Sequence, residues 1–438
     1  MARPQPRSPD APRRPAEPLG TAARRASLRL LDAVLRRGEP LEAALAAATR
    51  ALPGGPDRGL AHAIAAATLR QLPDLDALID SATRQRLPDD AKARMALRIA
   101  LAQVLVLGTP PHAAIATVLP LVDGGPRKLV HGVFGTLIRG EAALPAVPAL
   151  PAAVAERWRA AWGEPAVEGI ARAVAAPPPL DLTLADRAAT AEWAARLGGS
   201  SLAPGHVRLA QGHAPVAELP GFAAGAWWVQ DLAASLPARL LAATLAAPAR
   251  VLDLCAAPGG KTLQLAAAGH RVTALDASES RLARLRDNLA RTGQTADVIR
   301  ADALGWVPDQ PFDAVLLDAP CSATGIVRRH PDVLYRAHPR IIAEMAALQA
   351  RLLARAADWV RPGGTLAYAT CSLEPAEGEE QLAAFLAARP DYRLAAPAAP
   401  LPAGIAPRDD GSIRTHPGLL AEAGGCDGFF MAALNRAP

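Results

Sequence analysis

Apolar residues follow a helical spacing in the first third of the chain. Leu28, Leu31 and Leu35 lie three or four positions apart, with arginines between them. The stretch ARMALRIALAQVLVLG at residues 93–108 is the strongest helix signal, and it ends shortly before two prolines. We therefore expect an all-helical domain over residues 25–143.

Short apolar runs separated by amphipathic helical patterns follow from residue 226 to residue 438. The runs are ARVLDLCA (249–256), RVTALDA (271–277), ADVIRADA (296–303), FDAVLLDAP (312–320) and GTLAYATCS (364–372). This alternation is typical of an α/β domain built on a doubly wound parallel sheet.

Two further segments complete the predicted organisation. Residues 1–24 are rich in proline and arginine and lack apolar periodicity, so we expect a disordered basic tail there. Residues 141–152 contain three prolines and read as a linker. A tryptophan-bearing helix and short apolar runs follow the linker, which predicts a small α+β domain over residues 144–225.

Composition narrows the class of protein. A chain of 438 residues exceeds what one hydrophobic core usually supports. Arginine or proline interrupts every long apolar stretch, and the N-terminal residues lack the apolar core of a signal peptide. We therefore expect a cytoplasmic protein without membrane spans. Lysine and arginine exceed aspartate and glutamate by 47 to 42, which permits nucleic-acid binding without requiring it.

Two of the four cysteines have similar contexts. The cysteines lie 66, 50 and 55 residues apart, without a CxxC motif or paired histidines, so neither a disulfide framework nor a metal site is expected. Cys321 and Cys371 each follow an apolar run and each precede a serine. A thiolate in such a place can act as a nucleophile.

Acidic residues end several of the predicted strands. Ligands of doubly wound sheets bind beyond the carboxyl ends of the strands, where we place Asp276, Asp302 and Asp318. Asp276 follows the glycine-containing loop DLCAAPGGKT and could accept hydrogen bonds from ribose hydroxyls. The alternative for each aspartate alone is a helix cap.

The pattern distinguishes three candidate ligands: a nucleoside triphosphate, a dinucleotide and S-adenosylmethionine. A triphosphate-binding loop needs glycine where Cys255 stands, and the GxGxxG fingerprint of dinucleotide sites is absent. S-adenosylmethionine has a ribose and an adenine but no phosphates. Because carboxylates repel phosphate and accept hydrogen bonds from hydroxyls and amines, this ligand fits the acids better.

Three loops together suggest a family. DLCAAPGGKT, DAPCSATGIVRRHPD and YATCSLEP, in this order, resemble the signature loops of the bacterial 16S ribosomal RNA (cytosine-5)-methyltransferases of the Fmu/Sun (RsmB-like) family. Members have an N-terminal part like the antitermination factor NusB, and the similarity runs from about residue 22 to residue 434. The resemblance implies a class I, Rossmann-like, S-adenosylmethionine-dependent methyltransferase domain after a NusB-like RNA-binding domain.

The resemblance also implies residue roles. Cys371 matches the nucleophile that attacks carbon 6 of cytosine, and Cys321 matches the cysteine that assists product release. The cofactor would contact Cys255, Ala256, Ala257, Pro258, Gly259, Gly260, Lys261, Asp276, Asp302 and Asp318. The candidates for binding RNA phosphates are Arg328, Arg329 and His330.

We therefore expect a monomeric enzyme that forms 5-methylcytidine in 16S ribosomal RNA. Three alternatives remain at this point: a transfer RNA methyltransferase with the same chemistry, a non-catalytic RNA-binding assembly factor, and a nucleoside triphosphatase.

Overall fold

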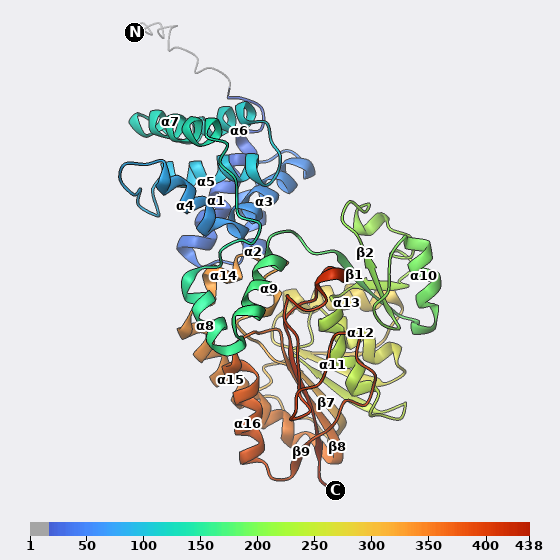
Figure 1. Ribbon diagram of the computed structural model, residues 1–438. Coiled ribbons are helices and arrows are strands. Elements are labelled where there is room, and N and C mark those ends of the chain that lie inside the picture. Colours follow the sequence, from blue (N-terminus) through green and yellow to red (C-terminus); the bar gives the residue numbers. More distant parts are fainter. Residues whose placement is uncertain (1–16) are drawn as a thin grey trace, which may run out of the picture. The chain divides into compact units, whose positions relative to one another are not determined.

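The computed structural model describes residues 17–438 and divides into two compact units, one ending at Pro145 and the other beginning at Ala146 (Figure 1). Most of the predicted tail over residues 1–24 lies outside the described residues. The predicted end of the tail at residue 24 is wrong, because helix α1 already begins at Thr21, and Ala23 and Arg24 are buried.

The first unit is helical, as the sequence predicts. Its helices are α1 (Thr21–Arg37), α2 (Leu41–Ala48), α3 (Gly55–Arg70), α4 (Leu72–Ser81), α5 (Lys92–Leu105), α6 (Pro111–Val118) and α7 (Gly125–Arg139). Helix α5 packs against five of the others and is buried on all sides from Ala93 to Gln103. The guanidinium groups of Arg94 and Arg98 in this stretch bind the carboxylate of Asp76. Because these buried charges are paired, the helix can occupy a core position despite its two arginines.

The second unit contains a large mixed sheet with helices on both faces (Figure 1). Its strands are β4 (Arg250–Leu254), β5 (Arg271–Asp276), β6 (Asp297–Arg300), β7 (Phe312–Asp318), β8 (Val360–Thr370), β9 (Tyr392–Leu394), β10 (Ile413–Arg414) and β11 (Phe430–Arg436). The order is β10-β11-β8-β7-β4-β5-β6, with β9 paired to β11. Strands β4 to β8 are parallel and β11 is antiparallel to β8. This arrangement confirms the predicted fold class.

Helices cover both faces of this sheet. They are α11 (Leu232–Ala242), α12 (Gly260–Ala267), α13 (Glu279–Thr292), α15 (Pro339–Asp358) and α16 (Glu379–Ala388). The short helix α14 (Val333–Arg336) packs instead in a separate core that includes Trp158 and Ile170. Leu252 and Leu317 belong to the core under α15, whereas their neighbours Val251 and Leu316 belong to the core under α11. Because both faces of the central strands β4, β7 and β8 are buried, these strands appear in the sequence as largely apolar runs, whereas the edge strand β6 has no fully buried residue.

The segment before the large sheet forms two smaller structures. Helices α8 (Ala152–Trp162) and α9 (Glu164–Val174) pack together. A three-stranded antiparallel sheet follows, made of β1 (Leu180–Leu184), β2 (His206–Leu209) and β3 (Trp227–Val229), with helix α10 (Thr190–Leu197). The predicted boundary between residues 225 and 226 differs from this arrangement, because β3 pairs with β1. Residues 146–438 form one compact unit.

No helix among residues 17–438 is long and apolar enough to cross a bilayer.

A buried ion pair ties the small sheet to helix α11. The Asp181 carboxylate accepts hydrogen bonds from Arg208 Nε at 2.6 Å and Arg208 Nη2 at 2.7 Å, and from the backbone N–H of Leu232 at 3.0 Å. Burial alone would raise the pKa of Asp181, but the hydrogen bonds from Arg208 and His206 outweigh it and lower the pKa. The Asp181 carboxylate is therefore an anion at neutral pH.

Replacing Asp181 by alanine should destabilise this unit strongly. The change leaves the Arg208 guanidinium buried without its carboxylate, which costs about 3–5 kcal/mol in comparable sites. Urea unfolding of Asp181→Ala should show this loss relative to Glu192→Ala, a change at an exposed position of α10. Because folding lowers the pKa of Asp181, its contribution is present above about pH 4 and decreases as the pH falls. Equal unfolding midpoints for the two variants would contradict this account.

Candidate active site

The carboxyl ends of the parallel strands surround one cavity of about 470 Å³. Its lining includes predicted site residues from the ends of five strands: Cys255, Asp276, Asp302, Asp318, Cys321 and Cys371. Cavities of this size are ordinary for small-molecule sites. The structure therefore brings the two cysteines and the three aspartates of the sequence analysis together.

The loop after β4 is held in place by the buried carboxylate of Asp253. Asp253 is fully buried and accepts a hydrogen bond of 2.6 Å from the Thr262 hydroxyl. Burial raises the pKa of Asp253 to about 7 despite this hydrogen bond. Gly259 has a φ of 105°, and a Cβ atom there would lie 3.0 Å from Leu285 Cγ. The backbone at Gly259 is therefore restricted to glycine by conformation as well as by space.

The loop's residues divide between two hollows. Cys255 lines the large cavity, where burial and then the carboxylates of Asp318 and Asp276 raise the pKa of its thiol to about 12. Because of this high pKa, Cys255 stays a neutral thiol, unsuited to nucleophilic attack.

A neighbouring groove of about 350 Å³ is lined by Ala256, Ala257, Pro258, Gly260 and Lys261.

Asp276 and Asp302 hold backbone N–H groups at the rim. The Asp276 carboxylate accepts hydrogen bonds from the N–H groups of Ala257 at 3.2 Å and Ser278 at 2.9 Å. The Asp302 carboxylate accepts one from the N–H of Leu304 at 3.0 Å. Each carboxylate has further lone pairs available for a ligand.

Asp318 lies between the cavity and the groove and lines both. Its carboxylate binds the Lys261 ammonium at 2.6 Å. The ammonium also lies 5.3 Å from the centre of the Phe429 ring. Lys261 therefore faces Asp318, and its charge is already balanced.

The two predicted catalytic thiols are in contact. The Sγ atoms of Cys321 and Cys371 lie 3.4 Å apart, and both residues are partly exposed. The hydrogen bond with Cys371, then burial, then the negative charges of Cys371 and Glu377 raise the pKa of Cys321 well above its ordinary value. The Cys321 sulfur therefore keeps its proton and can donate it in a hydrogen bond to a Cys371 thiolate.

Close backbone contacts fix the loops that hold these thiols. The N–H of Gly325 donates to the carbonyl of Cys371 at 2.9 Å, and the N–H of Gly428 donates to the carbonyl of Gly325 at 2.8 Å. A Cβ atom on Gly325 would lie 1.9 Å from the Gly428 oxygen. Only glycine allows this approach, so Gly325 determines how near the two cysteine loops lie.

A buried glutamate that the sequence analysis missed lies beside both loops. Glu377 is fully buried and accepts hydrogen bonds from the backbone N–H of Ser322 at 2.8 Å and from the hydroxyl groups of Ser322 and Ser372. These serines directly follow Cys321 and Cys371. The only sequence signal was an acid six residues after Cys371, and nothing in the sequence shows that it folds back.

The two arginines that were predicted to bind RNA phosphates differ in their exposure to solvent. Arg328 is 2% exposed, and its guanidinium binds Asp231 at 2.9 Å and Asp427 at 3.4 Å. A phosphate cannot reach a cation buried in this way, so the predicted role does not fit Arg328. Arg329 pairs with Asp427 but its side chain is 38% exposed and lines the groove. His330 is half-buried and lines neither hollow.

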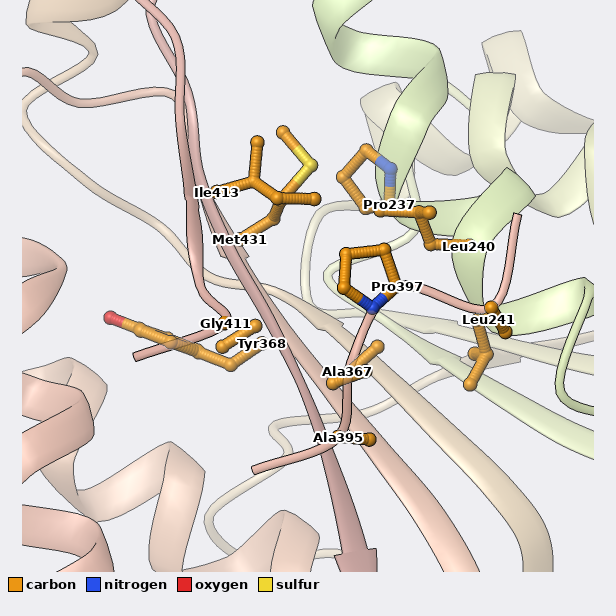
Figure 2. Close-up of a pocket in the computed structure, with 13 residues that line it drawn as sticks. Pro237, Leu240, Leu241, Ala367, Tyr368, Ala395, Pro397, Gly411, Ile413 and Met431 are labelled. Carbon is orange, nitrogen blue, oxygen red and sulfur yellow. The ribbon is translucent and has the colours of Figure 1, made fainter. Parts of the chain in front are cut away.

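A third hollow offers no comparable chemistry. It measures about 20 Å³ and lies against β8 and β11, with Pro237, Leu240 and Met431 in its wall (Figure 2). Tyr368 is the one residue with a polar side chain in its lining, and its hydroxyl points away and donates to the carbonyl of Glu377 at 2.8 Å (Figure 2). Among residues 17–438, no group of three or more acids, histidines or cysteines is arranged to hold a metal ion.

Solved structures share this fold. The structure of PH0851 superposes with a TM-score of 0.72 and 24% identity, covering 95% of this chain and 99% of that one. A methyltransferase homolog protein from Pyrococcus horikoshii superposes with a TM-score of 0.53 and 26% identity, covering 65% of this chain and 94% of that one.

Sequence comparisons identify the family. The family described as 16S rRNA methyltransferase RsmB/F matches residues 242–435, and the NusB family matches residues 21–134. Ribosomal RNA small subunit methyltransferase B of Xanthomonas campestris is 38% identical over 95% of this chain and 98% of its own length. Its counterpart in Xylella fastidiosa strain Temecula1 is 39% identical over 95% of this chain and 98% of its own length. With both of its units matched and nearly its whole length aligned, the chain belongs to the RsmB family of ribosomal RNA small subunit methyltransferases.

Proposed function

We propose that this chain transfers a methyl group from S-adenosylmethionine to carbon 5 of a cytidine in 16S ribosomal RNA. The observation that favours this function most is the pair of thiols 3.4 Å apart at the edge of an acid-lined cavity. Carbon 5 of cytosine is a poor nucleophile, and covalent attack by a thiolate at carbon 6 activates it. The relatives from Xanthomonas and Xylella, named for methylation of small-subunit ribosomal RNA, support the choice of substrate.

The large cavity suits the methyl donor chemically. Three carboxylates, those of Asp276, Asp302 and Asp318, line it with one arginine, Arg281. Such a lining repels phosphates, accepts hydrogen bonds from ribose hydroxyls and an adenine amine, and favours a positive charge. When bound, S-adenosylmethionine supplies an electrophilic methyl group on a sulfonium ion. We assign the ribose to Asp276, the adenine side to Asp302, and the position between donor and base to Asp318.

The cysteines have different tasks in the reaction. The Cys371 thiolate forms a bond to carbon 6, and the ring's electrons move to carbon 5, which would take the methyl group as its bond to the donor's sulfur breaks and S-adenosylhomocysteine leaves. The proton on carbon 5 then passes to solvent, its electron pair re-forms the ring's double bond, and the bond between carbon 6 and sulfur breaks, which returns Cys371 as a thiolate. Because the Cys321 thiol lies 3.4 Å from that sulfur, it can donate a hydrogen bond to the departing thiolate. Cys321 thereby assists release of the product.

Replacement of each cysteine should give a different result. Cys321→Ala should accumulate a covalent RNA adduct, visible as a slower band on a denaturing gel, because the thiol that assists release is missing. Cys371→Ala should give neither adduct nor methyl transfer. Cys426→Ala is the control, since this cysteine is buried in a separate contact with His416. Full turnover by Cys371→Ala would refute the assignment.

Bisulfite sequencing of 16S ribosomal RNA and of transfer RNA as separate substrates distinguishes the two RNA classes.

Equilibrium binding of S-adenosylmethionine tests the cofactor. Calorimetry should show binding by the full chain and a loss of about 10- to 100-fold for Asp276→Ala, the range typical of lost hydrogen bonds to a charged group. Asp287→Ala, at an exposed position on α13, should bind as the unaltered chain does. A chain that binds RNA but no S-adenosylmethionine would instead be an assembly factor.

A further inference from the structure

The groove beside the cofactor cavity has a charge pattern that the catalytic residues do not explain. It measures about 350 Å³ and meets the cavity at Asp318. Two carboxylates line it, those of Asp231 and Asp318, and each is already paired, with Arg328 and Lys261 respectively. Arg329 also lines the groove and pairs with Asp427, so the cations left uncompensated there are Arg284 and Arg291.

Those cations lie along one face of helix α13. The cations are Arg284 and Arg291. Asn288 lies between them, four residues after the first and three before the second, and all three residues line the groove. Within residues 17–438, neither Arg284 nor Arg291 forms an ion pair with a carboxylate. The Arg291 guanidinium donates to the backbone carbonyls of Phe222 at 2.9 Å and Trp227 at 3.0 Å. Arg284 is exposed. The stripe is therefore positively charged and partly open to solvent.

The facing wall is apolar and aromatic. Phe222 is half-buried, with the Arg291 guanidinium 4.2 Å from its ring centre. Val229, at the end of β3, is 47% exposed, an unusual value for a large apolar side chain of this protein. Trp228 supports the wall from beneath, with its indole N–H bonded to the side-chain oxygen of Gln230 at 2.8 Å. The groove thus combines a cationic stripe with a surface on which a base could stack.

We propose that this groove binds the single-stranded RNA next to the target cytidine, with a phosphate on Arg284 and Arg291 and a base against Phe222 and Val229. The proposal rests on the proposed function and extends it to the flanking nucleotides. Cations that follow a backbone beside aromatic side chains are the usual means of binding single strands. The groove meets the cavity at Asp318, so a strand lying in it places its next base near the thiols. The acid-lined cavity excludes the phosphates that the groove attracts.

The experiment compares two arginines of the same helix. Arg284→Ala should raise the KM for RNA about 10-fold, as expected for a lost charge-assisted contact, and should make the dependence of RNA affinity on log salt less steep by about 1. Arg286→Ala is the matched control, because Arg286 is exposed, bonds to Glu279 and does not line the groove. Phe222→Ala should raise the KM for RNA without changing the salt dependence.

S-adenosylmethionine binding should be unchanged in all three variants. Equal KM values and salt slopes for Arg284→Ala and Arg286→Ala would overturn the proposal for the groove. An unaltered chain that binds S-adenosylmethionine but methylates no RNA would instead refute the proposed function, so the two failures can be distinguished.

Independently of the groove, the buried Glu377 side chain bridges the two cysteine loops. One Glu377 side-chain oxygen accepts from the N–H of Ser322 at 2.8 Å and from the Gln349 amide at 3.3 Å. The other accepts from the hydroxyls of Ser322 and Ser372. Its backbone carbonyl accepts from the Tyr368 and Thr370 hydroxyls. We propose that Glu377 is the positioning residue that holds both cysteine loops at their mutual distance.

The requirement is geometric, which makes glutamine an informative replacement. A glutamine oxygen can accept the two N–H bonds, and its amide can donate to the two serine hydroxyls, which rotate to accept. Alanine removes all four side-chain bonds and leaves the serine groups buried. Misplacement of a catalytic group by about 1 Å can reduce the rate about 100-fold.

Glu377→Ala should therefore lower kcat about 100-fold, with the RNA KM and S-adenosylmethionine affinity unchanged. Glu377→Gln should recover most of that rate and of the covalent adduct formed in the Cys321→Ala background. Glu380→Ala, at an exposed position three residues further on, is the control. A kcat for Glu377→Ala within about 3-fold of the control would overturn the proposal, as would a glutamine variant no more active than the alanine variant.

Discussion

The register between β7 and β8 is the constraint on which the site depends. Asp318 pairs with Ala369, and the N–H of Ala319 donates to the carbonyl of Ala369 at 2.9 Å. Parallel strands that run in step end at the same edge of the sheet, so the loops that follow them begin side by side. The two cysteines, 50 residues apart in the sequence, thereby come within 3.4 Å. A slip of one residue would turn every side chain of the strand to the opposite face and separate the sulfur atoms.

Buried charge secures the segments around that edge. Asp231 caps the N-terminus of α11, and its carboxylate binds the Arg328 guanidinium and the backbone N–H of Asp427. Burial, together with the nearby Asp427 carboxylate, raises the pKa of Asp231 to about 6. These contacts join α11, the loop after Cys321 and the loop before β11. Breaking such a buried pair costs more than a surface ion pair contributes, so the cluster limits how far these loops can move.

Two adjoining hollows differ in charge, and Asp318 belongs to both. The charged side chains that line the cavity are three carboxylates and one arginine, whereas the groove has two arginines without acidic partners. In the proposed arrangement, the cavity favours the cationic methyl donor and the groove favours the anionic RNA. The Lys261–Asp318 ion pair lies at this border and is itself neutral as a pair, so it favours neither ligand electrostatically.

The sequence by itself determined the fold class, the order of the loops and the identity of Cys321 and Cys371 as the paired thiols, because apolar periodicity and strand ends are local properties. The sequence also predicted that Asp276, Asp302 and Asp318 lie at the same edge of the sheet, because parallel strands all end at that edge. Only the tertiary structure decided which charged groups face one another. Arg328 was expected to bind RNA phosphate, yet Asp231 and Asp427 surround it from positions about 100 residues away. Glu377 and the arginines of α13 were not recognisable for the same reason: a charge acquires its role from its partners, and those partners come from distant parts of the chain.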